Sequence, residues 1–102
     1  MLKLKPNCEH CDIDLPANST VAMICTFECT FCAHCVETVL HNVCPNCGGG
    51  FERRPQRIVT AWNKGVSLSD APASTERVFE PVDVDAHERF ASNIRDIPPH
   101  QR

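Results

Sequence analysis

The sequence Cys-Thr-Phe-Glu-Cys-Thr-Phe-Cys-Ala-His-Cys occupies residues 25–35 and places four cysteines within eleven positions. One further pair of cysteines precedes this segment and another follows it, so the chain carries four close pairs: Cys8–Cys11, Cys25–Cys29, Cys32–Cys35 and Cys44–Cys47. Two residues separate the members of three pairs, and three separate those of the other. Such spacing lets both sulfurs of a pair face one side of a tight turn, which is typical of zinc knuckles.

Eight cysteines in a short chain can form four disulfides or supply eight thiolate ligands. Disulfides persist in oxidising compartments, which an exported protein reaches through an apolar signal segment. The opening residues, MLKLKPNCEHCD, contain no such segment, and no run approaches the roughly 20 apolar residues of a membrane span. We therefore expect a cytoplasmic protein without a membrane partner, whose cysteines bind two Zn²⁺ ions; four-thiolate iron is the less favoured metal.

Two pairings of the four knuckles are open. Sequential pairing, as in a LIM-like arrangement, joins the first pair with the second and the third with the fourth. Alternating pairing joins the first with the third and the second with the fourth. LIM loops are longer than the thirteen residues between Cys11 and Cys25, so the spacing favours the alternating scheme. Its ligand sets are Cys8, Cys11, Cys32 and Cys35 for site one, and Cys25, Cys29, Cys44 and Cys47 for site two.

The order and spacing of the pairs resemble those of the RING finger. The closing pair, Cys44-Pro-Asn-Cys47, matches the Cys-Pro-x-Cys that is usual there, and Cys29 stands where that family commonly has a histidine. The resemblance implies two zinc ions in a cross-brace, with a helix after the third pair.

A closer resemblance covers about residues 5–57. The pattern CxFECTFCAxCxETVLxxxCPNCGG, followed by Arg-Arg-Pro, is similar to a small bacterial family known as domain of unknown function 1272. The resemblance implies a RING-like bacterial zinc protein of no established activity.

These observations predict a small metal-stabilised α+β fold in two parts. Residues 1–57 form a RING-like two-zinc module, with a short hairpin that includes residues 20–24 and one helix over residues 33–41, where Val36, Val39 and Leu40 share a face. A module of this size buries too little apolar surface to be stable without metal, disulfides or a partner.

Residues 58–102 form a tail that is partly flexible. Its apolar start, residues 58–62, can form one more short strand, and residues 63–81 have the composition of a linker. A short helix is expected over about residues 85–96. Asp85 is its predicted N-cap, because Glu88 follows three positions later in a pattern like a capping box.

Several side chains near the cysteines have two interpretations. His10, His34 and His41 are more simply surface or supporting groups than ligands, because eight cysteines already fill two sites. Phe27 and Phe31 are expected to cover the metal sites, and the single tryptophan, Trp62, to pack on a core. The arginines of the segment Arg53-Arg54-Pro-Gln-Arg57 are expected to form a solvated edge or to contact an acidic partner.

Three functions are compatible with this chain. A zinc-stabilised module that binds another protein is favoured. Ubiquitin-ligase-like activity follows only from the RING resemblance, and it is disfavoured because His10 stands where such ligases carry an apolar residue. Nucleic-acid binding through the arginines is disfavoured by the net charge of −3. Four-thiolate sites leave no open metal position for hydrolysis, so no catalytic residues are predicted.

Overall fold

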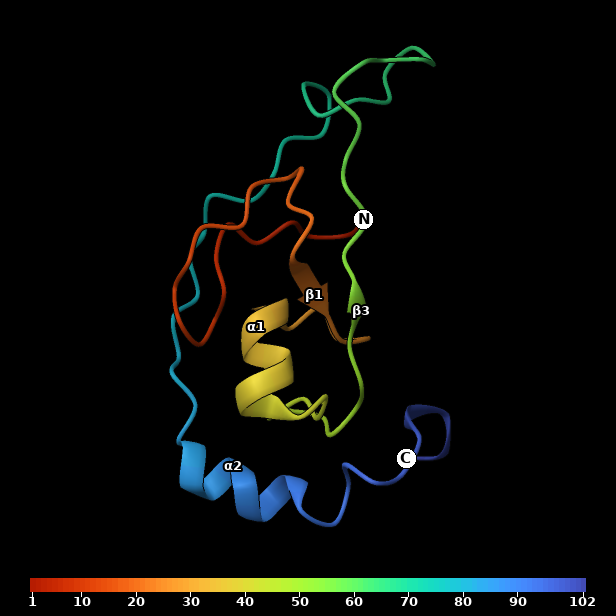
Figure 1. Ribbon diagram of the computed structural model, residues 1–102. Coiled ribbons are helices and arrows are strands. Elements are labelled where there is room, and N and C mark those ends of the chain that lie inside the picture. The colour runs from red at the N-terminus through yellow and green to blue at the C-terminus, as the bar shows by residue number, and fades with distance from the viewer.

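The computed structural model describes all 102 residues. A three-stranded antiparallel sheet in the order β2-β1-β3 lies beside a short helical segment, and a second helix packs across the end of that segment (Figure 1). The strands are β1 (Ala22–Ile24), β2 (Thr30–Cys32) and β3 (Glu52–Arg53). The helices are α1 (Ala33–Cys35), the π-helical turn η1 (Val36–Leu40) that continues it, α2 (Val84–Ala91) and the 3₁₀ turn η2 (Pro99–Gln101). The predicted α+β class with a short hairpin is confirmed.

The connection of the hairpin β1–β2 contains the second cysteine pair, and the Cys25 amide donates to Cys29 O at 3.2 Å. Ala22 is paired with Cys32 and Ile24 with Thr30, while β3 pairs on the other edge, with Met23 opposite Arg53. Glu28 adopts a left-handed conformation, with φ of 65°, to close the turn between the strands. The strand predicted at residues 58–62 is wrong, because no strand forms there and the third strand is Glu52–Arg53.

The helical segment predicted over residues 33–41 is present as α1 and η1. It ends where His41 and Asn42 both take positive φ, and the Asn42 side chain then accepts a hydrogen bond from the Phe51 amide at 2.8 Å. Its inner face contributes Val36 and Leu40 to the core, as the spacing predicted.

Half of the main core is cysteine. A cluster of twelve buried residues contains six cysteines and six others: Leu15, Ala22, Phe31, Val36, Leu40 and Phe51. Phe31 and Phe51 pack edge to face with ring centroids 5.5 Å apart. A fold with so few buried apolar side chains usually needs metal, disulfides or a partner for stability.

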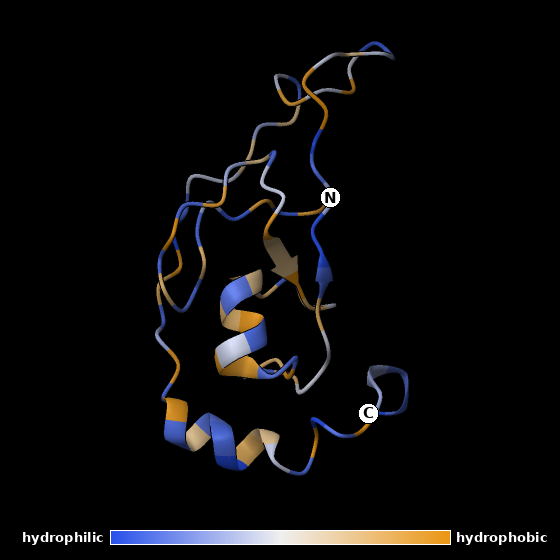
Figure 2. Cartoon of the chain, viewed as in Figure 1, coloured by the Kyte–Doolittle hydropathy of each residue, from blue (hydrophilic) through white to orange (hydrophobic).

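Phe27 and Trp62 do not take the positions that the sequence predicted. Phe31 is buried as expected, whereas Phe27 is 75% exposed at the tip of the β1–β2 turn. Trp62 is 80% exposed, because it lies in a loop, residues 58–71, that leaves the module and returns to it (Figures 1 and 2). This excursion loop explains a radius of gyration of 14.6 Å, against about 13 Å for a compact domain of this length.

The tail returns along the module after the excursion loop. In this return segment, residues 74–82, the Ser74 amide donates to Leu4 O at 3.0 Å and the Glu80 amide to Glu9 O at 2.9 Å. The buried Asn7 side chain exchanges two hydrogen bonds with the backbone of Val78. The linker flexibility predicted for residues 63–81 stays a prediction, but this part of the chain has defined partners.

Helix α2 packs against η1, and its N-cap lies two residues before the predicted one. Asp83 is the cap, with its carboxylate accepting from the Ala86 amide at 3.1 Å, and the helix ends at Ala91, short of residue 96. The buried residues of α2 are His87 and Ala91, and His87 Nε2 lies 3.0 Å from Leu40 O. None of the helices has the length and hydrophobicity that a membrane-spanning segment requires.

Candidate metal centre

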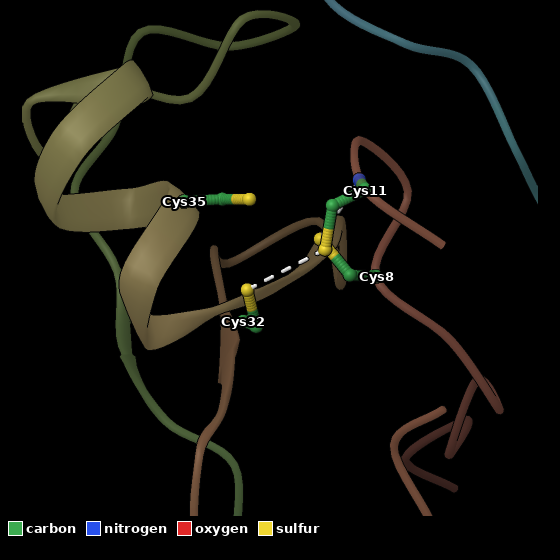
Figure 3. Close-up of side chains that lie close together, drawn as sticks. All are labelled: Cys8, Cys11, Cys32 and Cys35. Atoms are coloured by element: carbon green, nitrogen blue, oxygen red, sulfur yellow. Dashed lines mark hydrogen bonds between the residues drawn. The ribbon is translucent and has the colours of Figure 1, made fainter. Parts of the chain in front are cut away.

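The first and third cysteine pairs meet in one cluster. The Sγ atoms of Cys8, Cys11, Cys32 and Cys35 all lie within 4.8 Å of one another, and Figure 3 shows the four side chains turned toward a common space. The Sγ atoms of Cys11 and Cys32 are 3.8 Å apart. A zinc ion about 2.3 Å from each of four sulfurs requires sulfur–sulfur distances of about 3.8 Å, whereas a disulfide is about 2.05 Å long. The geometry therefore suits a shared tetrahedral cation.

The chain forms this cluster from a turn and a strand end. Asp12, with φ of 65°, closes the turn after the first pair, where the Cys11 amide donates to Cys8 Sγ at 3.5 Å. Cys32 is the last residue of β2, and Cys35 lies one turn into the helical segment. The strand end and the first helical turn thus face the first knuckle.

The second cluster contains three cysteines whose Sγ atoms also lie within 4.8 Å of one another: Cys25, Cys44 and Cys47. The fourth predicted member, Cys29, lies outside that limit but next to the cluster, since the thiols of Cys25 and Cys44 are among the groups that perturb its pKa. The Asn46 amide donates to Cys29 Sγ at 3.3 Å. Site two is therefore less tightly assembled than site one.

Backbone amides support the sulfurs of the second cluster. The amides of Phe27 and Gly49 donate to Cys25 Sγ and Cys47 Sγ, each at 3.4 Å. Gly48 has φ of 76°, and its amide donates to Cys44 O at 2.8 Å, which closes the Cys44–Cys47 turn. Amide donors of this kind stabilise thiolates, the form of cysteine that binds metal.

The alternating arrangement, which is part of the predicted fold, is confirmed, and the sequential alternative is wrong. One cluster joins the first and third pairs, and the other joins Cys25 of the second pair to the fourth pair. All eight cysteines are free thiols without a disulfide. That these sulfurs bind metal stays a prediction.

Burial and crowding oppose ionisation of these thiols. Burial, followed by the neighbouring Cys32 and Cys8, raises the pKa of the Cys35 thiol. Burial likewise raises the pKa of Cys44, while backbone amides of Asn46 and Cys47 act in the opposite direction. Burial is also the main cause of the raised pKa of Cys29. A cation in each cluster would offset the charge of the thiolates, so the donor set fits a metal that binds with release of protons.

The histidines lie outside both clusters. His10 Nδ1 accepts a hydrogen bond from the Val82 amide at 2.9 Å, and His41 Nε2 lies 3.7 Å from a Glu88 carboxylate oxygen. His34 is exposed on the helical segment. His10 and His41 thus contact the tail, a role that the sequence did not indicate.

The arginine segment binds the protein's own backbone. Arg54 is 3% exposed, and its guanidinium donates to the carbonyls of Lys5, Leu15 and Pro16 at 2.7–3.1 Å. Arg57 donates to two further carbonyls, those of Ala71 and Leu2, each at 2.8 Å. The interpretation of these arginines as a solvated edge or an acidic-partner contact is wrong for Arg54.

The fold and the two clusters define a small α+β module built around interleaved cysteine groups of the metal-binding kind. The chain belongs to the family described as "Protein of unknown function (DUF1272)", which matches residues 1–57. An uncharacterised protein of Rhizobium meliloti (strain 1021) is 58% identical over 81 residues, which are 79% of this chain and 89% of that relative. No solved structure matches. Because the family match spans 57 residues and the relative aligns over 81, at least 24 aligned residues lie in the tail.

Proposed function

We propose that the protein is a zinc-stabilised module that binds another protein. Each cluster holds one Zn²⁺: Cys8, Cys11, Cys32 and Cys35 the first, and Cys25, Cys29, Cys44 and Cys47 the second. The observation that carries the zinc assignment is the sulfur spacing, with four Sγ atoms within 4.8 Å of one another and one pair at the tetrahedral edge length. In this proposal Cys29, which lies next to Cys25 and Cys44, is the fourth ligand of site two.

The role of the metal is structural. A four-thiolate site has no open coordination position for water or substrate, so the proposal assigns neither site a reaction. Six cysteines form half of the main core cluster. Binding free energy at such sites is folding free energy, because the unfolded chain does not hold the sulfurs together.

The interaction role rests on large apolar side chains that nothing in the chain covers. Phe27 is 75% exposed on the turn that carries the second cysteine pair. Val59 and Trp62, which are 71% and 80% exposed, lie on the excursion loop. Exposed aromatic side chains are frequent anchors of protein interfaces. The partner is therefore expected to contact one or both of these loops.

The other two functions receive less support. Arg54 and Arg57 are engaged with backbone carbonyls and are not free to contact phosphates. His10, where a RING ligase carries an apolar residue, is bonded to the Val82 amide of the tail. Nucleic-acid binding therefore lacks the support of a basic surface, and ligase activity lacks the support of an open recruitment site.

Elemental analysis with native mass spectrometry tests the metal assignment. We expect two zinc ions per chain, and loss of dispersed amide resonances when a strong chelator removes them. One zinc, or a chain that stays folded after removal, contradicts the structural role.

The interaction role is tested by crosslinking in cells that express the tagged chain. We expect a defined crosslinked protein that is lost in the Trp62→Ser or Phe27→Ser variant. Ile13→Ser is the control, because Ile13 is also an exposed apolar residue, at 52%, but lies on neither loop. Equal loss of the crosslink in all three variants contradicts the assigned surface.

A further inference from the structure

Each group of ligand cysteines has one member at the protein surface. Cys47 is exposed in the second group and Cys11 in the first, whereas the other six cysteines are buried. Two buried cysteines, Cys25 and Cys44, lie beside Cys47, and the three Sγ atoms are within 4.8 Å of one another. A reagent in solution therefore meets Cys47 or Cys11 first, and a thiol that reacts at either position has other thiols next to it.

Cys47 lines a pocket of about 440 Å³ between the module and the tail. The module supplies Phe27 and the glycines that follow Cys47, and the tail supplies Pro99, His100 and Arg102. Phe27, Pro99 and His100 are themselves exposed, so the pocket is open to solvent. A molecule as small as a peroxide can therefore approach Cys47 while the chain stays folded.

A hydrogen-bond donor and a cationic side chain favour the thiolate form of Cys47. The Gly49 amide donates to Cys47 Sγ at 3.4 Å. Arg102 lines the same pocket, where Glu52 is the one carboxylate side chain. Donors and positive charge stabilise a thiolate, and the thiolate is the form of cysteine that reacts with oxidants. Exposure and surroundings together make Cys47 the candidate for oxidation.

The second cluster holds its sulfurs less closely than the first. All four Sγ atoms of site one lie within 4.8 Å of one another, whereas Cys29 lies outside this limit in site two. Cys29 Sγ instead accepts a hydrogen bond from the Asn46 amide at 3.3 Å. A set of ligands that must rearrange binds its ligand less tightly than a set that is already assembled. Site two is therefore expected to lose its metal before site one.

We propose that Cys47 is an oxidation site, through which a peroxide releases the metal of site two while site one keeps its own. The oxidant is hydrogen peroxide or an organic hydroperoxide, and the product is a disulfide between Cys47 and one of its buried neighbours, Cys25 or Cys44. This inference rests on the zinc assignment of the proposed function. It does not depend on the exposed apolar loops that are assigned to partner binding.

The reaction is a two-electron oxidation of two thiolates. The Cys47 thiolate attacks hydrogen peroxide, an S–O bond forms as the O–O bond breaks, and hydroxide leaves. The thiolate of Cys25 or Cys44 then attacks the sulfur of the resulting sulfenic acid, so an S–S bond forms and a second hydroxide leaves. Two protons from solvent convert the hydroxides to water. Site two then retains two of its four thiolates, which are too few to hold a cation there.

The test is native mass spectrometry of the full-length zinc-loaded chain, sampled at intervals after hydrogen peroxide is added. We expect a species with one zinc and one disulfide to accumulate before any metal-free species. Differential alkylation and peptide mapping should then place that disulfide between Cys47 and either Cys25 or Cys44. Loss of both zincs without a one-zinc species, a first disulfide within site one, or no oxidation of Cys47 in the folded chain overturns the proposal.

A matched pair of variants separates the two exposed cysteines. Cys47→His keeps a metal ligand but removes the thiolate, so it should lose the fast phase of peroxide-driven zinc release in an indicator-dye assay. Cys11→His makes the same change at site one and should retain that fast phase. Loss of the fast phase in both variants, or in neither, contradicts the role of Cys47. If either variant fails to bind two zincs, the mapping of the unsubstituted chain decides the question.

Metal content measured before peroxide is added separates this inference from the proposed function. A chain that carries two zincs and keeps both in peroxide overturns the oxidation site alone. A chain that carries no zinc overturns the proposed function and the oxidation site together.

Discussion

Arg54 offers the sharpest test of how the two ends of the module are joined. Its guanidinium is buried without a carboxylate partner and donates to three carbonyls, those of Lys5, Leu15 and Pro16. These carbonyls belong to the chain on either side of the first cysteine pair. Arg54 follows β3 directly, so it ties the third strand to the segment that forms the first knuckle.

Replacing Arg54 with methionine keeps most of its apolar stem and removes all three donors. A hydrogen bond to a charged group contributes about 1.5–3 kcal/mol, and a buried acceptor left unpaired costs about 1–3 kcal/mol. The buried guanidinium also carries a desolvation cost, which lowers the pKa of Arg54 and offsets part of the gain. Three such bonds sum to at least about 4.5 kcal/mol. Because the desolvation cost offsets part of this sum, we expect a net loss of about 3 kcal/mol.

The assay is urea unfolding of the zinc-loaded protein, followed by far-ultraviolet circular dichroism because Trp62 is too exposed to report on the core. Arg89→Met is the matched control. Arg89 is exposed on α2 and forms no side-chain hydrogen bond or ion pair, so its loss should change stability by less than about 0.5 kcal/mol. A loss below about 1 kcal/mol for Arg54→Met would refute the reasoning that the guanidinium joins these segments.

Three further predictions concern the tail and the metal. Gly50→Ala should cost about 1–3 kcal/mol and raise proteolysis of the C-terminal segment, because the new Cβ would lie 2.8 Å from Pro99 Cγ; an added Pro99→Gly should restore protection. Asp83→Ala should destabilise α2 by about 1 kcal/mol in thermal unfolding, whereas Asp85→Ala should have a small effect, and the reverse order would return the cap to Asp85. Acidification should release zinc steeply, since protons compete with metal for the thiolates. Burial raises the pKa of Cys35, which strengthens that competition. The stability that the metal supplies is therefore present at higher pH and is lost as the pH falls. In an indicator-dye titration, the midpoint of zinc release should lie at a higher pH than for thiols of ordinary pKa.

The cysteine spacing carried most of what could be predicted. Two cysteines separated by two or three residues form a local turn, so each knuckle can be recognised from a few neighbouring positions. The helix over residues 33–41 was predictable for the same reason, because its apolar face repeats along the local sequence. The offset of Cys29 from its cluster was not predictable, because it leaves no signal in the local spacing; Cys29 Sγ accepts a hydrogen bond from the Asn46 side chain instead.

Errors arose where two local signals were equivalent. Asp83 and Asp85 both precede candidate helical residues, and the Asp85–Glu88 pair has the sequence of a capping box. The structure uses Asp83, so the helix starts at Val84, immediately after the return segment. At residues 58–62 an apolar run suggested a strand, but a strand requires a partner edge, and this segment lies in the excursion loop away from the sheet.

The docking of the tail was beyond sequence patterns because its contacts are polar and distant along the chain. Asn7 and Val78 are 71 positions apart, and His10 and Val82 are 72 apart. A buried asparagine that pairs with a backbone amide and carbonyl leaves no periodic signal. The arginines were misinterpreted for the same reason, since their partners are carbonyls, which every residue has.

The tail is best understood as a second layer that the small module requires. The module's core is half cysteine, and the Leu40 carbonyl at the end of its helical segment, which accepts the Val43 amide at 3.0 Å, gains a second contact from His87 Nε2. At the other end, Arg102 donates to the carbonyls of Asn42 and Gly48, which flank the closing cysteine pair. The relative's alignment extends at least 24 residues past the family region, so the tail is shared beyond this chain. A segment that supplies partners to both ends of the metal-binding region, and completes a pocket with it, acts as part of the same structural unit.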